Sequence, residues 1–324
     1  MKKPKVFVSR LLPDEALEHL RASCEVEVNG ADRTLTPVEL KKRLDGSAGL
    51  VSLLTDAVGD DVLATPGLKC VSNVAVGHNN VDVAAATRRK VLVTNTPGVL
   101  TETTADFAWA LMMAAARRIP EADRYTRRGL YQGWDIMSML GVDVHNKTLG
   151  LVGFGRIGVA MAQRAKGFGM RVLYSDVKRA PEDLESAVSA RHATLSSLLS
   201  QSDFVSVHVP LSPETRHLIG AKELGEMKRT AVLINTARGA VIDEAALVAA
   251  LRKGTIFAAG LDVYENEPDM APGLAELDNV VLAPHIASAS SATRTRMAMI
   301  AASDMVAALE GRRPSHLVNP EALG

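Results

Sequence analysis

One stretch decides the fold class of this chain: Gly150-Leu151-Val152-Gly153-Phe154-Gly155-Arg156-Ile157-Gly158. Its glycines Gly153, Gly155 and Gly158 form a G-x-G-x-x-G pattern that follows an apolar strand and opens a helical segment. In such a turn the first glycine permits the tight bend, the second lets a pyrophosphate approach, and the third lets the helix pack on the strand. The helix N-terminus adds N–H donors and the positive end of its dipole. The stretch therefore predicts a dinucleotide-binding βαβ unit.

The next apolar run, Arg171–Ser175, ends in Asp176, which lies 18 residues after Gly158. An acid at about this spacing binds the adenosine ribose hydroxyls of NAD and repels the 2′-phosphate of NADP. Lys178 and Arg179 follow and would partly offset that repulsion. NAD is therefore the favoured cofactor, with NADP possible. The alternative is an ordinary glycine-rich turn with Asp176 as a helix N-cap.

Composition narrows the class of protein. The chain has 324 residues, 47% of them hydrophobic, which suits a globular protein of about two domains. The 37 Lys and Arg balance the 37 Asp and Glu, so nothing in the net charge favours nucleic acid or an anionic membrane as a partner. Two cysteines, Cys24 and Cys70, give no disulfide framework and no metal spacing. We expect no metal, no membrane span and a cytoplasmic location.

Short apolar runs alternate with helical patterns along the chain. Most of the runs are continuous rather than alternating, which is typical of strands buried on both faces of a parallel sheet. The expected strands are Lys5–Ser9, Gly49–Leu54, Cys70–Val74, Val91–Val93, Thr148–Val152, Arg171–Ser175, Phe204–Val207, Ala231–Ile234, Ala258–Leu261 and Val280–Leu282. The pattern predicts an α/β fold with helices on both faces of the sheets.

Two long helical stretches, Thr101–Arg118 and Ser290–Glu310, flank the second set of β/α units. This arrangement predicts one domain inserted into another. The first domain would contain residues 1–98 and 288–324, and the second, dinucleotide-binding domain would contain residues 99–287.

Three polar segments follow predicted strands, where open parallel sheets bind ligands. Arg238 follows Ala231–Ile234, Glu267 follows the strand ending at Leu261, and His285 follows Val280–Leu282. An arginine can hold a carboxylate, a histidine can give a proton to a developing alkoxide, and a glutamate can orient that histidine. Each also has a simpler interpretation: a surface arginine, a solvated acid and a buried histidine. Spacing alone does not choose His285 over the other candidates, His78, His145, His192, His208 and His217.

The motifs together resemble the D-isomer-specific 2-hydroxyacid dehydrogenase family over essentially the whole chain. They are Gly153–Gly158, His208-Val209-Pro210-Leu211 with Glu214-Thr215, Asn235-Thr236-Ala237-Arg238-Gly239, Gly260-Leu261-Asp262-Val263, Glu267-Pro268 and Pro284-His285-Ile286-Ala287.

The resemblance implies two doubly wound parallel-sheet domains, Rossmann-like or flavodoxin-like, with the NAD(P)-binding domain inserted in the substrate-binding domain. It implies that Arg238 contacts the substrate, that His285 is the acid/base and that Glu267 is its partner. It places substrate-binding backbone N–H groups at Val76 and Gly77, and cofactor contacts at Gly153, Gly155, Gly158, Arg156, Ile157, Asp176, Thr104, Val209, Pro210, Thr215, Thr236, Ala237 and Asp262.

Looser matches are similar to the glyoxylate/hydroxypyruvate reductase subgroup: Leu53-Leu54-Thr55-Asp56, Gly133-Trp134 and Gly141-Val142-Asp143-Val144. They imply reduction of a short 2-oxo acid with NAD(P)H, with Leu53 near the substrate. The family resemblance implies a homodimer, and the subgroup match implies that Trp134 either reaches the partner's active site or only packs in the interface. Two alternatives stay open: another D-2-hydroxyacid dehydrogenase, of the D-lactate or phosphoglycerate type, and a non-enzymatic dinucleotide-sensing protein like the corepressors of this fold.

Overall fold

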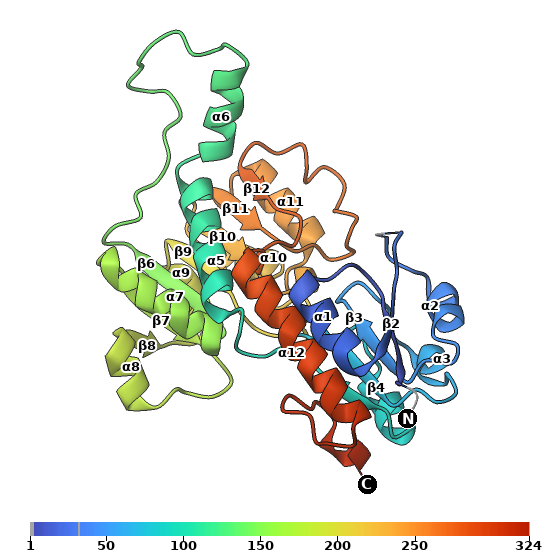
Figure 1. Cartoon of the computed structure of the whole chain (residues 1–324). Coiled ribbons are helices and arrows are strands. Elements are labelled where there is room, and N and C mark those ends of the chain that lie inside the picture. The colour runs from blue at the N-terminus through green and yellow to red at the C-terminus, as the bar shows by residue number, and fades with distance from the viewer. Residues whose placement is uncertain (1–2, 32, 324) are drawn as a thin grey trace. The chain divides into compact units, whose positions relative to one another are not determined.

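The computed structural model describes residues 3–31 and 33–323 of the chain. It divides into two compact units, of which unit 1 comprises Met1–Leu100 and Ala289–Gly324 and unit 2 comprises Thr101–Ser288. Figure 1 labels the helices and strands. None of the described helices is long and apolar enough to cross a membrane.

Unit 1 is built on a five-stranded parallel sheet with the order β2-β1-β3-β4-β5. Its strands are β1 (Lys5–Val8), β2 (Glu25–Val28), β3 (Gly49–Ser52), β4 (Cys70–Asn73) and β5 (Leu92–Thr94). Its helices are α1 (Asp14–Ser23), α2 (Pro37–Arg43), α3 (Asp60–Leu63), α4 (Val83–Arg88), α12 (Ser291–Leu309) and the short 3-10 turn η2 (Pro320–Leu323). The chain returns to this unit through α12, which packs against α1, β3 and β4. Ser290 caps α12, because its side chain accepts the backbone N–H of Thr293.

Unit 2 is built on a seven-stranded parallel sheet with the order β12-β11-β10-β9-β6-β7-β8. Its strands are β6 (Thr148–Val152), β7 (Arg171–Ser175), β8 (Ala190–His192), β9 (Phe204–Val207), β10 (Val232–Asn235), β11 (Ala258–Leu261) and β12 (Val280–Leu282). Its helices are α5 (Thr101–Ala116), α6 (Ile119–Arg127), α7 (Arg156–Gly167), α8 (Glu182–Val188), α9 (Leu195–Gln201), α10 (Ala221–Glu226) and α11 (Glu244–Lys253), with a 3-10 turn η1 (Gly239–Val241). The strand order reverses between β6 and β9, and ligands bind such sheets outside the carboxyl ends of the strands at that point.

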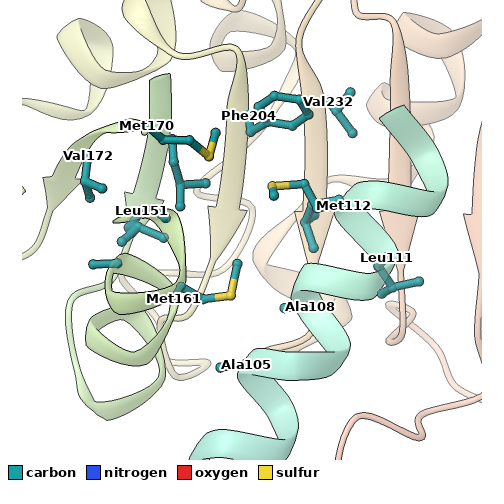
Figure 2. Close-up of a cluster of buried hydrophobic side chains, with 14 of the residues drawn as sticks. Ala105, Ala108, Leu111, Met112, Leu151, Met161, Met170, Val172, Phe204 and Val232 are labelled. Atoms are coloured by element: carbon teal, nitrogen blue, oxygen red, sulfur yellow. The ribbon is translucent and has the colours of Figure 1, made fainter. Parts of the chain in front are cut away.

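Small residues bring the covering helices close to the sheet of unit 2. Figure 2 shows Ala105 and Ala108 of α5 on the side of the helix that faces Met161 of α7. Gly260 of β11 has no side chain to hold α5 away, and a Cβ there would lie 3.2 Å from the Cβ of Leu111. A second buried cluster covers the opposite face of the same sheet. Helices therefore pack on both faces, as in a doubly wound fold.

The predicted α/β fold class is confirmed, with two parallel sheets and all ten expected strands near their predicted positions. Two strands were not predicted, β2 and β8, and each is a short strand at the edge of its sheet. The predicted helix Thr101–Arg118 ends two residues early, at Ala116. Arg118 has a left-handed φ of 54° and pairs with Glu121, so the chain turns there into α6.

Candidate active site

The turn between β6 and α7 leaves one side of its backbone open. A Cβ on Gly153, where φ is +97°, would lie 2.7 Å from the carbonyl carbon of His208, and a Cβ on Gly158 would lie 2.4 Å from the carbonyl oxygen of Gly153. A Cβ on Gly155 would meet nothing within 4 Å. No side chain caps the N-terminus of α7. Two of the glycines therefore permit close packing, while the third faces space in which a phosphate could approach a helix N-terminus.

Asp176 lies beside this turn, at the carboxyl end of β7. Its Oδ2 accepts the backbone N–H of Phe154 at 2.7 Å, so the acid contacts the glycine-rich turn directly. The helix after it, α8, begins at Glu182 with Pro181 at the N-cap position. The alternative interpretation of Asp176 as a helix N-cap is therefore wrong.

The two basic residues after Asp176 have different surroundings. Lys178 is exposed to solvent. The guanidinium of Arg179 instead bonds to the carboxylate of Glu185, with Nη2 and Oε2 2.9 Å apart. Of the two bases that were expected to offset partly the repulsion of a 2′-phosphate, Arg179 thus has a carboxylate partner of its own, whereas among the described residues no carboxylate pairs with Lys178.

His285 and Glu267 form a hydrogen-bonded pair. Nδ1 of His285 lies 2.9 Å from Oε2 of Glu267, and the other carboxylate oxygen accepts the backbone N–H of Tyr264 at 3.1 Å. Burial raises the pKa of Glu267, but the hydrogen bond and the charge of His285 outweigh it and hold this pKa below its usual value. Among the described residues nothing bonds to Nε2 of His285, which leaves that nitrogen available to a ligand.

Asp262 braces the loop that carries His285. Its carboxylate is completely buried and accepts the backbone N–H groups of Ile286 at 2.8 Å and Ala287 at 2.7 Å. Its backbone carbonyl accepts the N–H of His285. Burial raises the pKa of Asp262, and the two loop N–H groups oppose that rise. The sequence suggested Asp262 only as a cofactor contact, and its bracing role became visible only with the pairing of β11 and β12.

Arg238 lies in a turn that Asn235 shapes at the end of β10. The Asn235 side chain accepts the N–H of Ala237 at 3.0 Å and donates to the carbonyl of Arg238 at 2.9 Å. Gly239 lets this turn approach the segment after β11, since a Cβ there would lie 1.9 Å from the carbonyl carbon of Tyr264. Burial lowers the pKa of Arg238, and the charge of Glu267 opposes that shift. A guanidinium stays charged in proteins, so Arg238 is a half-buried cation with Glu267 in its electrostatic field.

The other predicted cofactor residues of unit 2 lie at strand ends and on helices. Thr215 closes the loop after β9, because its hydroxyl accepts from Ser212 N–H at 2.8 Å and donates to the carbonyl of Pro210 at 2.7 Å. The hydroxyl oxygen of Thr236 is buried and has no hydrogen-bond partner in the part of the chain that the structure describes. The remaining positions are Arg156 and Ile157 in the first turn of α7, buried Thr104 in α5, and Val209 and Ala237, which pack against the second core cluster.

Two other histidines of unit 2 compare directly with His285. Burial lowers the pKa of His208 to about 4, which disfavours the protonated ring that a proton donor needs at neutral pH. His217 also pairs with a glutamate, with Nε2 and the Oε1 of Glu265 2.7 Å apart. That carboxylate oxygen is shared with Arg216, which lies 2.8 Å away.

In unit 1 a polar network fixes the predicted substrate-binding loops. Asp56 accepts the N–H of Leu53 at 2.7 Å, and Asn80 donates to the carbonyls of Leu53 and Asp56. The carbonyl oxygens of Val76 and Gly77 are likewise occupied, by the side chains of Asn95 and Asn73 respectively. Among the described residues neither the Val76 nor the Gly77 backbone N–H donates a hydrogen bond. Both N–H groups are therefore held in place by bonds to their neighbouring carbonyls and are free to bind a ligand.

Trp134 is 83% exposed in the irregular segment that follows α6. Tyr131, Ile136 and Met137 of the same segment are also largely exposed. Figure 1 shows α6 and this segment extending away from the sheet of unit 2. Their apolar surface has no covering within the unit.

A cavity of about 270 Å³ lies at the amino ends of β11 and β12, between these strands and the junction of α5 and α6. None of the predicted site residues lines it. Across the described residues no group of three or more His, Cys, Asp and Glu side chains could hold a metal ion.

Comparison with known proteins connects this geometry to a family. Residues 109–287 match the model of the D-isomer specific 2-hydroxyacid dehydrogenase NAD binding domain. The chain is 51% identical to the glyoxylate reductase of Korarchaeum cryptofilum, covering 99% of this chain and 97% of that protein. The crystal structure of the TT0316 protein from Thermus thermophilus has a TM-score of 0.91 and 46% identity, over 97% of this chain and 99% of that chain. An NADPH-dependent glyoxylate/hydroxypyruvate reductase from Sinorhizobium meliloti, solved with NADP and malonate, has a TM-score of 0.87 and 32% identity, over 99% and 98% of the two chains.

Proposed function

The chain belongs to the D-isomer-specific 2-hydroxyacid dehydrogenase family, and from this premise we propose that it reduces a short 2-oxo acid, glyoxylate or hydroxypyruvate, to the 2-hydroxy acid with NAD(P)H. The observation that carries the proposal is the His285–Glu267 pair on a loop braced by Asp262, with the cation Arg238 in the field of Glu267. A carbonyl reduction needs such a proton donor and such an anchor for the substrate anion.

The turn after β6 is the proposed dinucleotide site. The open side of Gly155 and the uncapped first turn of α7, at Arg156 and Ile157, would bind the pyrophosphate. Asp176 would accept the adenosine ribose hydroxyls, so NAD is the favoured cofactor and NADP remains possible. The dinucleotide, when bound, supplies the hydride.

Arg238 is the proposed anchor of the substrate. Its planar guanidinium can bond to a carboxylate with two parallel N–H groups and polarise the adjacent carbonyl. Partial burial strengthens this attraction, since water screens the charges less there. The free N–H groups of Val76 and Gly77 in unit 1 are proposed to bind the substrate carboxylate as well, with Leu53 near the substrate.

His285 is the proposed acid. In its protonated form Nε2 gives a proton to the oxygen of the reduced carbonyl, while Nδ1 stays bonded to Glu267. Glu267 keeps its charge because its pKa is held below the usual value, so it fixes the ring and stabilises the imidazolium. Asp262 sets the direction of the ring through the backbone of the loop.

Unit 2 is proposed as the dinucleotide-binding domain and unit 1 as the substrate-binding domain, and their bounds lie within two residues of the predicted boundaries at residues 98 and 288. The exposed apolar segment around Trp134 supports a homodimer, because such surface is normally covered by a partner. Trp134 either reaches the active site of the second copy or only packs in the interface. The cytoplasmic location stays a prediction.

The decisive experiment mixes the purified full chain with a panel of 2-oxo acids and either NADH or NADPH, and follows loss of reduced-nucleotide absorbance. We expect the highest kcat/KM with glyoxylate or hydroxypyruvate and with NADH. A clear preference for pyruvate or a phosphorylated 2-oxo acid would favour the D-lactate or phosphoglycerate type instead. Tight NADH binding without turnover on any member of the panel would favour a dinucleotide-sensing protein.

A further inference from the structure

The segment Asp176–Ala180, which follows the proposed ribose-binding acid, is tied to α8. The backbone N–H of Ala180 donates to the phenol oxygen of Tyr174 at 2.8 Å. That phenol in turn donates to Oε1 of Glu185 at 2.5 Å. The Ala180 end of the segment is therefore connected through one buried tyrosine to one glutamate.

The same glutamate binds Arg179 with both of its oxygens. Nε of Arg179 donates to Oε1 at 3.1 Å, and Nη2 donates to Oε2 at 2.9 Å. The Glu185 side chain is only 8% exposed, although that of Arg179 is 69% exposed. Parallel bonds of this kind are the strong form of an arginine–carboxylate pair. The hydrogen bonds from Arg179 and then from Tyr174 lower the pKa of Glu185 to about 2, so this carboxylate is ionised at any ordinary pH.

The pair is linked to the glycine-rich turn as well. The ring of Tyr174 stacks on Phe154 with 4.0 Å between centroids, and the N–H of Phe154 donates to Asp176. A continuous set of contacts therefore runs from Glu185 to the turn that would hold the pyrophosphate. Arg179 is attached to these packed residues through its two bonds to Glu185, while 69% of its side chain remains exposed.

We propose that Glu185 is a specificity-determining residue: by binding Arg179 it keeps that guanidinium from the 2′ position of the adenosine ribose and so favours NAD over NADP. An arginine near this position is what accommodates the 2′-phosphate of NADP. Here the arginine is present in the sequence, but Nε and Nη2 of its guanidinium bond to Glu185, whereas Lys178 is exposed to solvent. The inference rests on the proposed dinucleotide site and is independent of the proposed substrate.

The test measures dissociation constants of NADH and NADPH by nucleotide fluorescence, without substrate. Glu185→Gln retains an acceptor for Tyr174 but loses the charge that holds Arg179. We expect NADPH to bind about tenfold tighter to this variant, the lower range for one charge-assisted hydrogen bond, and NADH to change less than about twofold. Glu185→Asp keeps the charge on a side chain too short for both partners, and is expected to show a smaller shift in the same direction. Glu185→Asp therefore still tests the proposal if Glu185→Gln folds poorly.

Two controls isolate the role of Arg179. Asp183→Asn removes an equal charge from an exposed position of the same helix and should leave both constants unchanged. Adding Arg179→Ala to Glu185→Gln should abolish the gain in NADPH affinity. The inference is overturned if Glu185→Gln leaves the ratio of the two constants unchanged, or if the double variant keeps the gain. A wild-type chain that binds neither dinucleotide would overturn the proposed cofactor site, and this inference with it.

Discussion

Replacing Gly155 with alanine should leave the folded protein intact while weakening dinucleotide binding. The backbone at Gly155 has φ −75° and ψ −163°, which alanine adopts without strain, and the added methyl would meet no atom within 4 Å. Gly158→Ala is the matched contrast, because there the methyl would lie 2.4 Å from the carbonyl oxygen of Gly153. The two substitutions are chemically identical and lie in the same turn.

The expected magnitudes follow from these distances. Where alanine fits, Gly→Ala restricts the unfolded chain and stabilises by about 0.4–1 kcal/mol. For a unit of this size that raises Tm by about 1–4 °C. A methyl in the space where a pyrophosphate must lie should cost binding about 1–3 kcal/mol, as overpacking does elsewhere, which is roughly a 5- to 150-fold rise in Kd for NADH. The Gly158 variant instead loses about 1–3 kcal/mol or more of stability, because a backbone atom must move.

Thermal unfolding without ligand and a fluorescence titration with NADH measure the two effects separately. Gly155→Ala should melt at or above the wild-type temperature and bind NADH weakly, whereas Gly158→Ala should melt several degrees lower. If Gly155→Ala bound NADH as tightly as the wild type, the pyrophosphate would not approach Gly155. If it melted as early as Gly158→Ala, the open space beside Gly155 would not exist in solution.

Four further outcomes are expected. His285→Asn should lower kcat with glyoxylate by about 10²–10⁴, whereas His217→Asn should not. Both positions have a left-handed φ, which asparagine tolerates. Equal losses of kcat in the two variants would contradict the assignment of His285 as the acid. Arg238→Lys should reduce kcat/KM severely, because lysine keeps the charge and loses the planar fork, and an unchanged value would remove Arg238 from the site. Asp176→Ser should raise the kcat/KM ratio of NADPH over NADH mainly through KM, and a ratio that stays fixed would show that Asp176 does not bind the ribose. The stability that ionised Glu267 contributes is present above its unfolded pKa and is lost as pH falls through its lower folded pKa. In chemical denaturation, the free energy of unfolding of the wild type should therefore exceed that of Glu267→Gln by less in acid. A difference that does not change with pH would argue against the pairing of Glu267 with His285.

The fold could be predicted where its signals are strong. Strands buried on both faces appear as continuous apolar runs, and these were located within one or two residues of their observed bounds. The edge strand β2, Glu25-Val26-Glu27-Val28, alternates charged and apolar residues and resembles exposed chain, so the pattern for buried strands misses it. The end of α5 depends on the left-handed backbone of Arg118. The types of the surrounding residues do not indicate that conformation, so the end of the helix was predicted two residues too late.

The features of the site likewise divide into those that the sequence predicts and those that it does not. The glycine spacing and Asp176 are local signals, because the turn and the following strand impose them. The link between Arg179 and Glu185 crosses Pro181 and a helix start, and the brace from Asp262 to Ile286 and Ala287 joins residues 24 and 25 positions apart. Such contacts depend on which strands pair, and a single sequence does not state that pairing. For His285 and Glu267 the resemblance to a family supplied what the spacing could not.

Two histidine–glutamate pairs, His217 with Glu265 and His285 with Glu267, lie after strands of the same sheet. The pairs differ in what else is bonded to the carboxylate. Glu265 serves His217 and is also bonded to Arg216, so a permanent cation already compensates its charge. Among the described residues no arginine bonds to Glu267, whose second oxygen accepts only a neutral backbone N–H. A carboxylate without a permanent cation bonded to it stabilises an imidazolium more strongly than one that is already neutralised. We therefore propose His285, whose ring has a carboxylate partner of its own and a free Nε2, rather than His217, as the acid of the reduction.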